Sequence, residues 1–206
     1  MPGDPRELVF ALCHEVRNLL TAVRLQAELL EGETQGAELA LARERLLLLS
    51  ARSGALLAQV PPLLSQPALG ERVEPADAIA ALRVGLFAPA SERVDLELKS
   101  AALAPCVRIG GDLLHVLLIT ALFGALELAP GLARVRVSAE ARDTGVVFRI
   151  EGPVRVASGG DGGGELSGRQ LELACADAIL APLGGRARVR VSDALRRCEL
   201  ELPAAE

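Results

Sequence analysis

Mostly apolar residues in the first third of the chain recur at alternating steps of three and four. This spacing is typical of an α-helix whose one face packs against a partner. In a first segment it joins Val9, Leu12, Val16, Leu19, Val23, Gln26 and Leu30. In a second segment it joins Leu39, Ala42, Leu46, Leu49, Ser53, Leu56 and Val60. The pattern predicts two long helices that pair as an antiparallel hairpin.

Local signals predict where these helices begin and end. Asp4 followed by Pro5 is typical of a helix N-terminus, because proline fits the first helical position after a capping residue. The segment from Gly32 to Gly36 predicts a loop. Pro61-Pro62 predicts the end of the second helix, since proline removes a backbone donor. The hairpin is therefore expected to occupy residues 1–62.

The second helix carries leucines beyond its seam, at Leu47, Leu48 and Leu57. One partner helix cannot cover so wide an apolar stripe. Two hairpins that associate as a four-helix bundle would bury it, which predicts a homodimer. The alternative is that the stripe packs on the rest of the same chain.

Beyond the hairpin, a linker rich in Pro and Gly covers residues 61–73. The pattern after it predicts helices over residues 75–88, 112–128 and 169–181. It predicts strands over residues 94–99, 107–109, 133–140, 146–151, 186–191 and 197–202. Residues 73–206 are therefore expected to form an α+β domain, with helices on one side of a mainly antiparallel sheet.

Composition and charge narrow the range of partners. Aromatic residues make up 2% of the 206 residues, and the formal net charge is −5. Neither stacking platforms for single-stranded nucleic acid nor a basic surface for phosphate backbones is expected, so nucleic acid is excluded as a partner. The partners that remain are proteins and small molecules.

The sequence predicts neither a metal site nor a membrane span. The four Cys and two His have no spacing that could hold zinc. The apolar stretches are interrupted by charge or Gly before about 18 residues, and the first residues lack the regions of a signal peptide. We expect a cytoplasmic protein with reduced thiols.

One histidine on the first predicted helix is a candidate for chemistry. His14 falls on the face furthest from the partner helix, Asn18 follows one turn later on the same side, and Glu15 adjoins it. A neutral ring nitrogen of an exposed imidazole is a nucleophile, and a neighbouring carboxylate can fix its tautomer. For a histidine alone, the simpler interpretation is an ordinary solvated side chain.

The sequence around His14 resembles the phosphoacceptor motif H-E-x-R-N-x-L of the dimerisation and phosphotransfer hairpin in histidine kinases. The matching run is HEVRNLLTAVRLQAELL, and the similarity continues through the second helix. The resemblance implies that His14 is phosphorylated, with Glu15 as its acid/base neighbour. It implies that Asn18 positions water where such kinases act as phosphatases. Arg17 belongs to the same motif, and Leu19 replaces a proline that is common there.

Residues 73–206 resemble the catalytic, ATP-binding domain that follows this hairpin in histidine kinases, an α/β sandwich. In that family a long helix carries two Asn and a basic residue that hold Mg²⁺ and phosphate. Aligned on Asp112, Thr120 and Gly124 take the Asn positions and Glu127 takes that of the basic residue. Neither Thr nor Gly offers a carboxamide oxygen to Mg²⁺, and a carboxylate repels phosphate.

The glycine boxes of that family are also incomplete. The strand over residues 146–151 leads into Glu151-Gly152-Pro153-Val154, with no Asp-x-Gly-x-Gly. Asp161-Gly162-Gly163-Gly164 matches half of such a box, within a Gly-rich loop from Ser158 to Gly168. Gly168 is the glycine left of the second box. The resemblance implies a retained fold with a degenerate nucleotide site, and therefore no cofactor-binding residues.

An acceptor hairpin followed by a degenerate ATP-binding domain is similar to the ChpT-type histidine phosphotransferases. This resemblance implies a homodimeric protein of a two-component phosphorelay. Such a protein moves phosphoryl groups between the aspartates of response-regulator receiver domains through His14, without ATP. Mg²⁺ would be supplied by the partner receiver.

Three other functions stay open from the sequence. Asn18 would be central to a receiver-directed phosphatase or a regulator that sequesters a receiver. An active histidine kinase would bind ATP through residues that differ from the usual contacts of the family. A pure dimerisation scaffold would have kept the motif by ancestry. Phosphotransfer is favoured because Asn18, within the intact motif, is the only asparagine in the chain.

Overall fold

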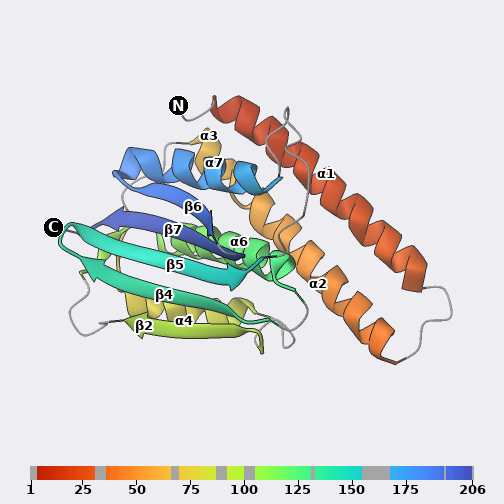
Figure 1. Ribbon diagram of the computed structural model, residues 1–206. Coiled ribbons are helices and arrows are strands. Elements are labelled where there is room, and N and C mark those ends of the chain that lie inside the picture. Colours follow the sequence, from red (N-terminus) through yellow and green to blue (C-terminus); the bar gives the residue numbers. More distant parts are fainter. Residues whose placement is uncertain are drawn as a thin grey trace.

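The computed structural model describes residues 4–30, 36–65, 70–86, 92–99, 105–130, 133–154, 168–192 and 194–205. A pair of long helices forms the N-terminal part, and a sheet with helices on it forms the rest (Figure 1). Parts of the sequence-based predictions lie outside the described residues: loop residues 32–35, Pro67 of the linker, and residues 158–167 of the Gly-rich loop with Asp161-Gly162-Gly163-Gly164.

The N-terminal hairpin consists of α1, Pro5–Leu30, and α2, Ala37–Leu57, which lie side by side (Figure 1). The backbone N–H of Arg6 donates to Asp4 Oδ1 at 2.9 Å, which confirms that Asp4 caps α1. The predicted seam is buried where the helices meet the core, at Leu12, Val16, Leu19 and Leu56.

The prediction that Pro61-Pro62 ends the second helix is wrong. α2 already ends at Leu57, and the two prolines lie in the first turn of a separate short helix, α3, Val60–Leu64. A first turn needs no intrahelical N–H bonds and suits the fixed φ of proline, so a proline pair fits the start of a helix as well as its end. α3 packs against α1 and α7, and its Leu63 is buried.

A five-stranded sheet with the order β2-β4-β5-β7-β6 is the framework of the C-terminal part. Its strands are β2 (Val94–Lys99), β4 (Val135–Arg142), β5 (Gly145–Pro153), β6 (Arg186–Ser192) and β7 (Leu195–Pro203). β2 runs parallel to β4, and the other neighbours are antiparallel. Two short strands, β1 (Arg72–Val73) and β3 (Val107–Arg108), pair with each other. Six of these strands lie where the sequence predicted them, whereas β1 falls at the end of the predicted linker.

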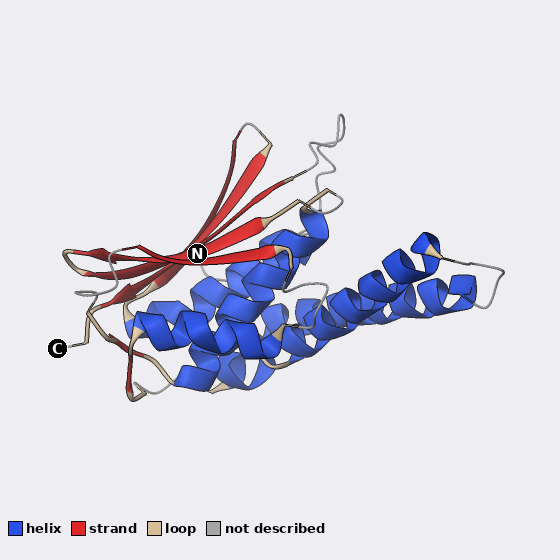
Figure 2. Cartoon of the chain, turned by 90° about the horizontal axis from the view of Figure 1, so that it is seen from below, coloured by secondary structure: helices blue, strands red, loops and turns tan. Residues whose placement is uncertain are grey.

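Three helices cover one face of this sheet (Figure 2). They are α4 (Pro75–Gly85), α6 (Gly111–Leu128) and α7 (Gly168–Leu180), and a 3₁₀ turn, Ala181–Leu183, follows α7. α6 packs against α4, α7 and β5, and it supplies fully buried leucines at Leu114, Leu118 and Leu122. The predicted α+β arrangement is confirmed.

The hairpin is packed on the C-terminal part, while its far end projects beyond the sheet (Figures 1 and 2). α2 contacts α6, and α1 contacts α7. The buried Arg93, just before β2, donates to Glu44 Oε1 of α2 at 2.9 Å and to the Leu126 carbonyl of α6 at 3.1 Å. Arg93 therefore ties the hairpin to the C-terminal end of α6.

The leucine stripe of the second helix is only partly covered by the same chain. Leu48 is buried, whereas Leu47 is 39% exposed and Leu57 is 48% exposed. The intrachain alternative therefore applies to one edge of the stripe, and the other edge is open within the described residues. The four-helix bundle of two chains stays a prediction.

Two segments are long and apolar enough to cross a membrane by length and composition alone, Leu39–Leu64 and Gly111–Leu128. The second is α6, and 61% of that segment is buried inside the protein. A helix that is apolar all round is typical of a domain core as well as of a membrane span. The absence of membrane contact stays a prediction.

Candidate functional site

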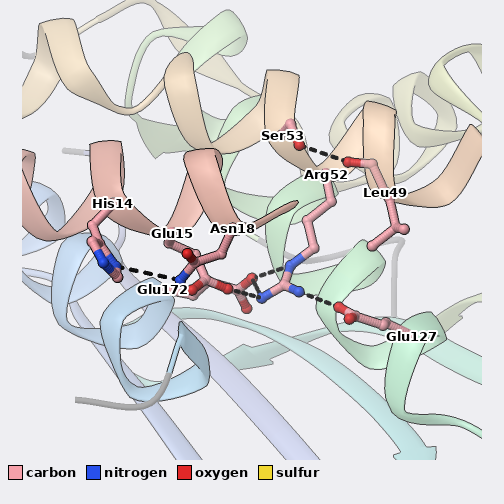
Figure 3. Close-up of polar contacts among 8 residues, drawn as sticks. All are labelled: His14, Glu15, Asn18, Leu49, Arg52, Ser53, Glu127 and Glu172. Carbon is pink, nitrogen blue, oxygen red and sulfur yellow. Dashed lines mark hydrogen bonds and ion pairs between the residues drawn. The ribbon is translucent and has the colours of Figure 1, made fainter. Parts of the chain in front are cut away.

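His14 is exposed on α1, as the sequence predicts. Asn18 Nδ2 lies 3.3 Å from His14 Nδ1, because residues four apart stack on one helix face (Figure 3). Among the described residues, no hydrogen bond reaches His14 Nε2. The arrangement engages one ring nitrogen and leaves the other accessible to a reactant.

The surface around His14 combines apolar and charged side chains. Phe10, one turn before His14, is 77% exposed, and Leu25, further along the same face, is 55% exposed. Arg17 lies exposed between them, and its carbonyl accepts a hydrogen bond from Thr21 Oγ1 at 2.9 Å. An exposed aromatic beside an arginine is typical of surfaces that contact other proteins.

Glu15 does not lie against the imidazole. Its Oε1 is 3.5 Å from Arg52 Nη2 of α2, and the carboxylate makes no hydrogen bond to His14 among the described residues. Glu15 follows His14 directly, so it lies about 100° further around the helix axis. The contact with the ring that the sequence suggested is therefore absent in this geometry, and an acid/base role for Glu15 stays a prediction.

Arg52 is a buried cation where α1, α2, α6 and α7 meet, and the sequence-based predictions did not include it. Its Nε and Nη2 each lie 2.7 Å from Glu172 Oε1 of α7, and its Nη1 pairs with Glu127 of α6 (Figure 3). With Glu15, three carboxylates surround a side chain that is 5% exposed. Because a buried charge must be paired and hydrogen-bonded, this cluster fixes the four helices to one another.

The sequence does hold a signal for Arg52. It stands four residues after Leu48 and four residues before Leu56, both buried, so the three share the inward face of α2. An arginine between inward-facing leucines indicates a buried cation with carboxylate partners. The sequence does not identify these partners, because Glu172 is 120 positions away.

The charges of the cluster shift one another's titration. Burial by itself lowers the pKa of Arg52, but the carboxylates around it outweigh burial and hold this pKa above its ordinary value. Burial raises the pKa of Glu172, and attraction to Arg52 opposes this shift without overcoming it. Arg52 therefore stays charged at neutral pH, and Glu172 ionises less readily than an ordinary carboxyl.

The positions aligned with nucleotide contacts of kinases are covered in this fold. Thr120 is 2% exposed, and its Oγ1 donates to a backbone carbonyl of the same helix at 2.7 Å. At Gly124, a Cβ would lie 2.6 Å from Glu172 Oε2, closer than such atoms approach. Glu127 pairs with Arg52. α7 and Arg52 thus occupy the face of α6 that would meet a nucleotide.

Little space remains on the side of α6 that carries Thr120. A cavity of about 10 Å³ is lined by Gln59, Thr120, Glu172 and Arg196, among others, and one water molecule requires about that volume. Sites for drug-sized ligands and cofactors usually measure about 300–1,000 Å³. Gln59, which is 1% exposed between α2 and α3, lines the cavity from the hairpin side. Among the described residues, the surroundings of Thr120 and Glu172 leave no space for a nucleotide, whereas Glu127 also lines a cleft of about 470 Å³ between α2 and the end of α6.

Two of the cysteines, Cys175 and Cys198, are buried. Burial, with Glu172 nearby, raises the pKa of Cys175 to about 12, and burial raises the pKa of Cys198 to about 11. Because the thiolate is the reactive form, both thiols are inert near neutral pH. Within the described ranges, no group of three or more His, Cys, Asp or Glu is placed to hold a metal ion.

Several solved structures of histidine kinases have a similar architecture. The histidine kinase AdeS of Acinetobacter baumannii superimposes with a TM-score of 0.59 over 94% of this chain and 98% of that chain, at 16% identity. The histidine kinase ThkA, in its complex with the response regulator TrrA, superimposes with a TM-score of 0.56 at 16% identity. That alignment covers 97% of this chain and 61% of the other. The fold is histidine-kinase-like.

The kinase likeness extends to the catalytic domain taken alone. The catalytic domain of ThkA matches 65% of this chain over 95% of its own length, with a TM-score of 0.50 and 18% identity. No protein-family model and no curated protein matches the chain. At such identities the likeness establishes the fold, and function is argued from the site itself.

The contact between Glu172 and Gly124 predicts opposite effects for two Gly→Ala substitutions. Gly124→Ala displaces the Glu172 carboxylate from Arg52, so we expect it to lower the free energy of unfolding by about 1–3 kcal/mol. Gly54→Ala on α2, where a Cβ meets nothing within 4 Å, should raise it by about 0.5–1 kcal/mol through helix propensity. Urea unfolding measures both variants, and equal stability of the two would contradict the packing of Glu172 on α6.

Proposed function

We propose that this chain is a histidine phosphotransferase of a two-component phosphorelay. It accepts a phosphoryl group from the aspartate of one receiver domain onto His14 and passes it to another, without using ATP. The observation that carries the proposal is an exposed His14 with an accessible Nε2 and with Asn18 at Nδ1, on a kinase-like fold in which Thr120 is buried and Glu172 covers Gly124.

The transfer is a displacement at phosphorus with His14 Nε2 as nucleophile. Its lone pair forms the N–P bond, the P–O bond to the receiver's aspartate breaks, and the aspartate leaves as a carboxylate. The imidazole must be neutral, with its proton on Nδ1. Asn18 supports that tautomer when its carboxamide oxygen faces Nδ1, an orientation reached by a flip of the amide. Mg²⁺ held by the receiver would neutralise charge on the phosphoryl oxygens.

The proposed partner is a receiver domain that docks on the face of α1 around His14. Phe10 is one of four Phe in the chain, yet it is 77% exposed one turn from the nucleophile. Arg17 supplies a cation on the same face, which suits a partner whose reactive site is acidic and phosphorylated. The complex of the structurally similar ThkA with a response regulator supports this choice of partner.

The coverage of Thr120 and Gly124 supports transfer without ATP over a divergent, active kinase. A nucleotide at Thr120 and Gly124 would have to displace Glu172 from its contact with Arg52. Removing one partner of a buried ion pair costs about 3–5 kcal/mol. Binding energy of that size would be lost before any contact with phosphate formed.

The proposal includes a homodimer that forms through α2. Leu39, Leu47 and Leu57 are 44%, 39% and 48% exposed, and helical spacing places them within one face of α2. Exposed leucines that share one helix face indicate an interaction surface. A second hairpin would cover it as a four-helix bundle.

A cytoplasmic location belongs to the same proposal. The cysteines at positions 13, 106, 175 and 198 are free thiols, as a reducing compartment keeps them. No contact with a membrane is required by any step of the transfer.

A second candidate function, a receiver-directed phosphatase, is favoured by the exposed carboxamide of Asn18 beside His14. In that case Asn18 would orient water toward the receiver's phosphoaspartate, and His14 would not become phosphorylated. The two functions differ in where the phosphoryl group goes.

Incubation with a receiver labelled with ³²P on its aspartate tests the proposal. We expect label on the wild-type chain without ATP and none on His14→Ala, because the nucleophile is lost. His115→Ala is the matched control, since His115 is the other histidine and lies half-buried on α6. An unlabelled wild type, or equal label on His14→Ala, would refute phosphotransfer.

Asn18→Ala separates the two candidates in the same assay. For phosphotransfer, we expect the variant to take label more slowly and to release no extra inorganic phosphate. If the wild type releases phosphate without carrying label, and Asn18→Ala stops that release, the phosphatase is the function.

The dimer is tested by a charge placed on the exposed leucine face. Leu47→Glu combined with Leu57→Glu should convert a dimer to a monomer, because two desolvated carboxylates in the bundle are unfavourable. Val84→Glu on α4, at a position that is 89% exposed, should leave the dimer intact. Sedimentation velocity measures the mass of each, and a wild type that sediments as a monomer would contradict the proposal.

A further inference from the structure

We propose that Arg52 is a positioning residue of the His14 site, which holds and neutralises Glu15 and links it to the C-terminal part through Glu127 and Glu172. The inference rests on the proposed function, because it concerns how a negatively charged phosphoryl group reaches His14. The side of α6 that contacts a nucleotide in histidine kinases would here hold a cation beneath α1.

The first observation is the direction of the Glu15 side chain. Glu15 directly follows His14, yet its carboxylate turns to Arg52 Nη2 at 3.5 Å, and its side chain is 18% exposed (Figure 3). A carboxylate next to the nucleophile would repel an incoming phosphoryl group if it were not paired. Its pairing with Arg52 lowers that barrier to approach.

The second observation is what holds Arg52 in reach of Glu15. Nε and Nη2 of Arg52 each lie 2.7 Å from Glu172 Oε1, and Nη1 of Arg52 pairs with Glu127. A guanidinium with three protein partners cannot swing away from the hairpin. The positions of α6 and α7 therefore set the position of Arg52, and through it that of the Glu15 carboxylate.

The third observation joins two departures from the kinase pattern. Gly124 stands where that helix has an asparagine, and any Cβ there would meet the Glu172 carboxylate. Glu127 stands where a basic residue is usual, and it pairs with Arg52. Gly124 and Glu127 each lack a nucleotide contact of the kinase pattern. Together they form the site that holds Arg52, because Gly124 leaves space for Glu172 and Glu127 pairs with the guanidinium.

A positioning role predicts that Arg52 changes the rate at which His14 reacts with an anionic reagent. Comparing an anionic with a neutral reagent separates this electrostatic effect from an effect on folding. Phosphoramidate is an anionic donor whose P–N bond breaks as the His14 N–P bond forms, with ammonia as the leaving group. Diethyl pyrocarbonate is a neutral reagent that acylates the same ring. Both act without a receiver, and mass spectrometry of the His14 peptide gives each rate.

We expect Arg52→Gln to slow phosphorylation of His14 by phosphoramidate about fivefold, because the charge of Glu15 is no longer balanced. The rate with diethyl pyrocarbonate should not change. Glu15→Gln should raise the phosphoramidate rate about threefold, for the same reason with the opposite sign. The double variant should return to about the wild-type rate, because the two residues are coupled.

The control variant is Arg134→Gln, which removes an exposed arginine paired with Asp95 at 2.7 Å on the sheet. It should leave both reagent rates unchanged. The effect of Arg52→Gln should shrink as salt is raised, since added ions screen partly exposed charges.

The inference is overturned if Arg52→Gln changes both reagent rates equally, or if it changes neither. If Arg52→Gln does not fold, Glu15→Gln decides alone, because it leaves Arg52 paired with Glu127 and Glu172. A slower phosphoramidate rate in Glu15→Gln would show an acid/base role for Glu15, and an unchanged rate would show no electrostatic effect. Either result overturns the proposal.

The receiver assay separates this inference from the proposed function. If no receiver labels wild-type His14 while both reagents give the expected pattern, phosphotransfer is refuted and the positioning role of Arg52 stands. If a receiver labels His14 while Arg52→Gln leaves both reagent rates unchanged, phosphotransfer stands and the positioning role is refuted.

Discussion

The burial of one arginine side chain governs how the two parts of this molecule fit together. Arg52 lies on the inward face of α2, and a buried guanidinium requires charge partners and hydrogen-bond acceptors. α6 and α7 bring Glu127 and Glu172 to it. Glycine at position 124 leaves room for the second of these carboxylates. The face that meets a nucleotide in histidine kinases thus has a structural use here.

The chemistry proposed for the chain needs little of this architecture directly. His14 and Asn18 share one exposed helix face, so a single well-formed helix places them. The sheet and its helices contribute by holding that helix through α7 and by pairing Glu15 with Arg52. The proposed transfer therefore depends on one helix, while the rest of the kinase-like fold holds that helix in place.

The sequence predicted what depends on local spacing and missed what depends on distant contacts. The cap at Asp4, the placement of His14 and Asn18 on one helix face, and the positions of most strands follow from residues close in the chain. Pro61-Pro62 was misassigned because the same pair fits a helix end and a first turn, and the choice depends on a buried site for Leu63. Arg52 was missed because Glu172 is 120 positions away.

Central to the proposed function is that Glu172, paired with Arg52, keeps a nucleotide from Thr120 and Gly124 of α6. Isothermal titration calorimetry of the full chain with Mg²⁺ and ATP tests it most directly. We expect no saturable heat of binding, because Thr120 is buried and a nucleotide there would have to displace Glu172 from Arg52. Saturable binding of one ATP per chain would contradict it.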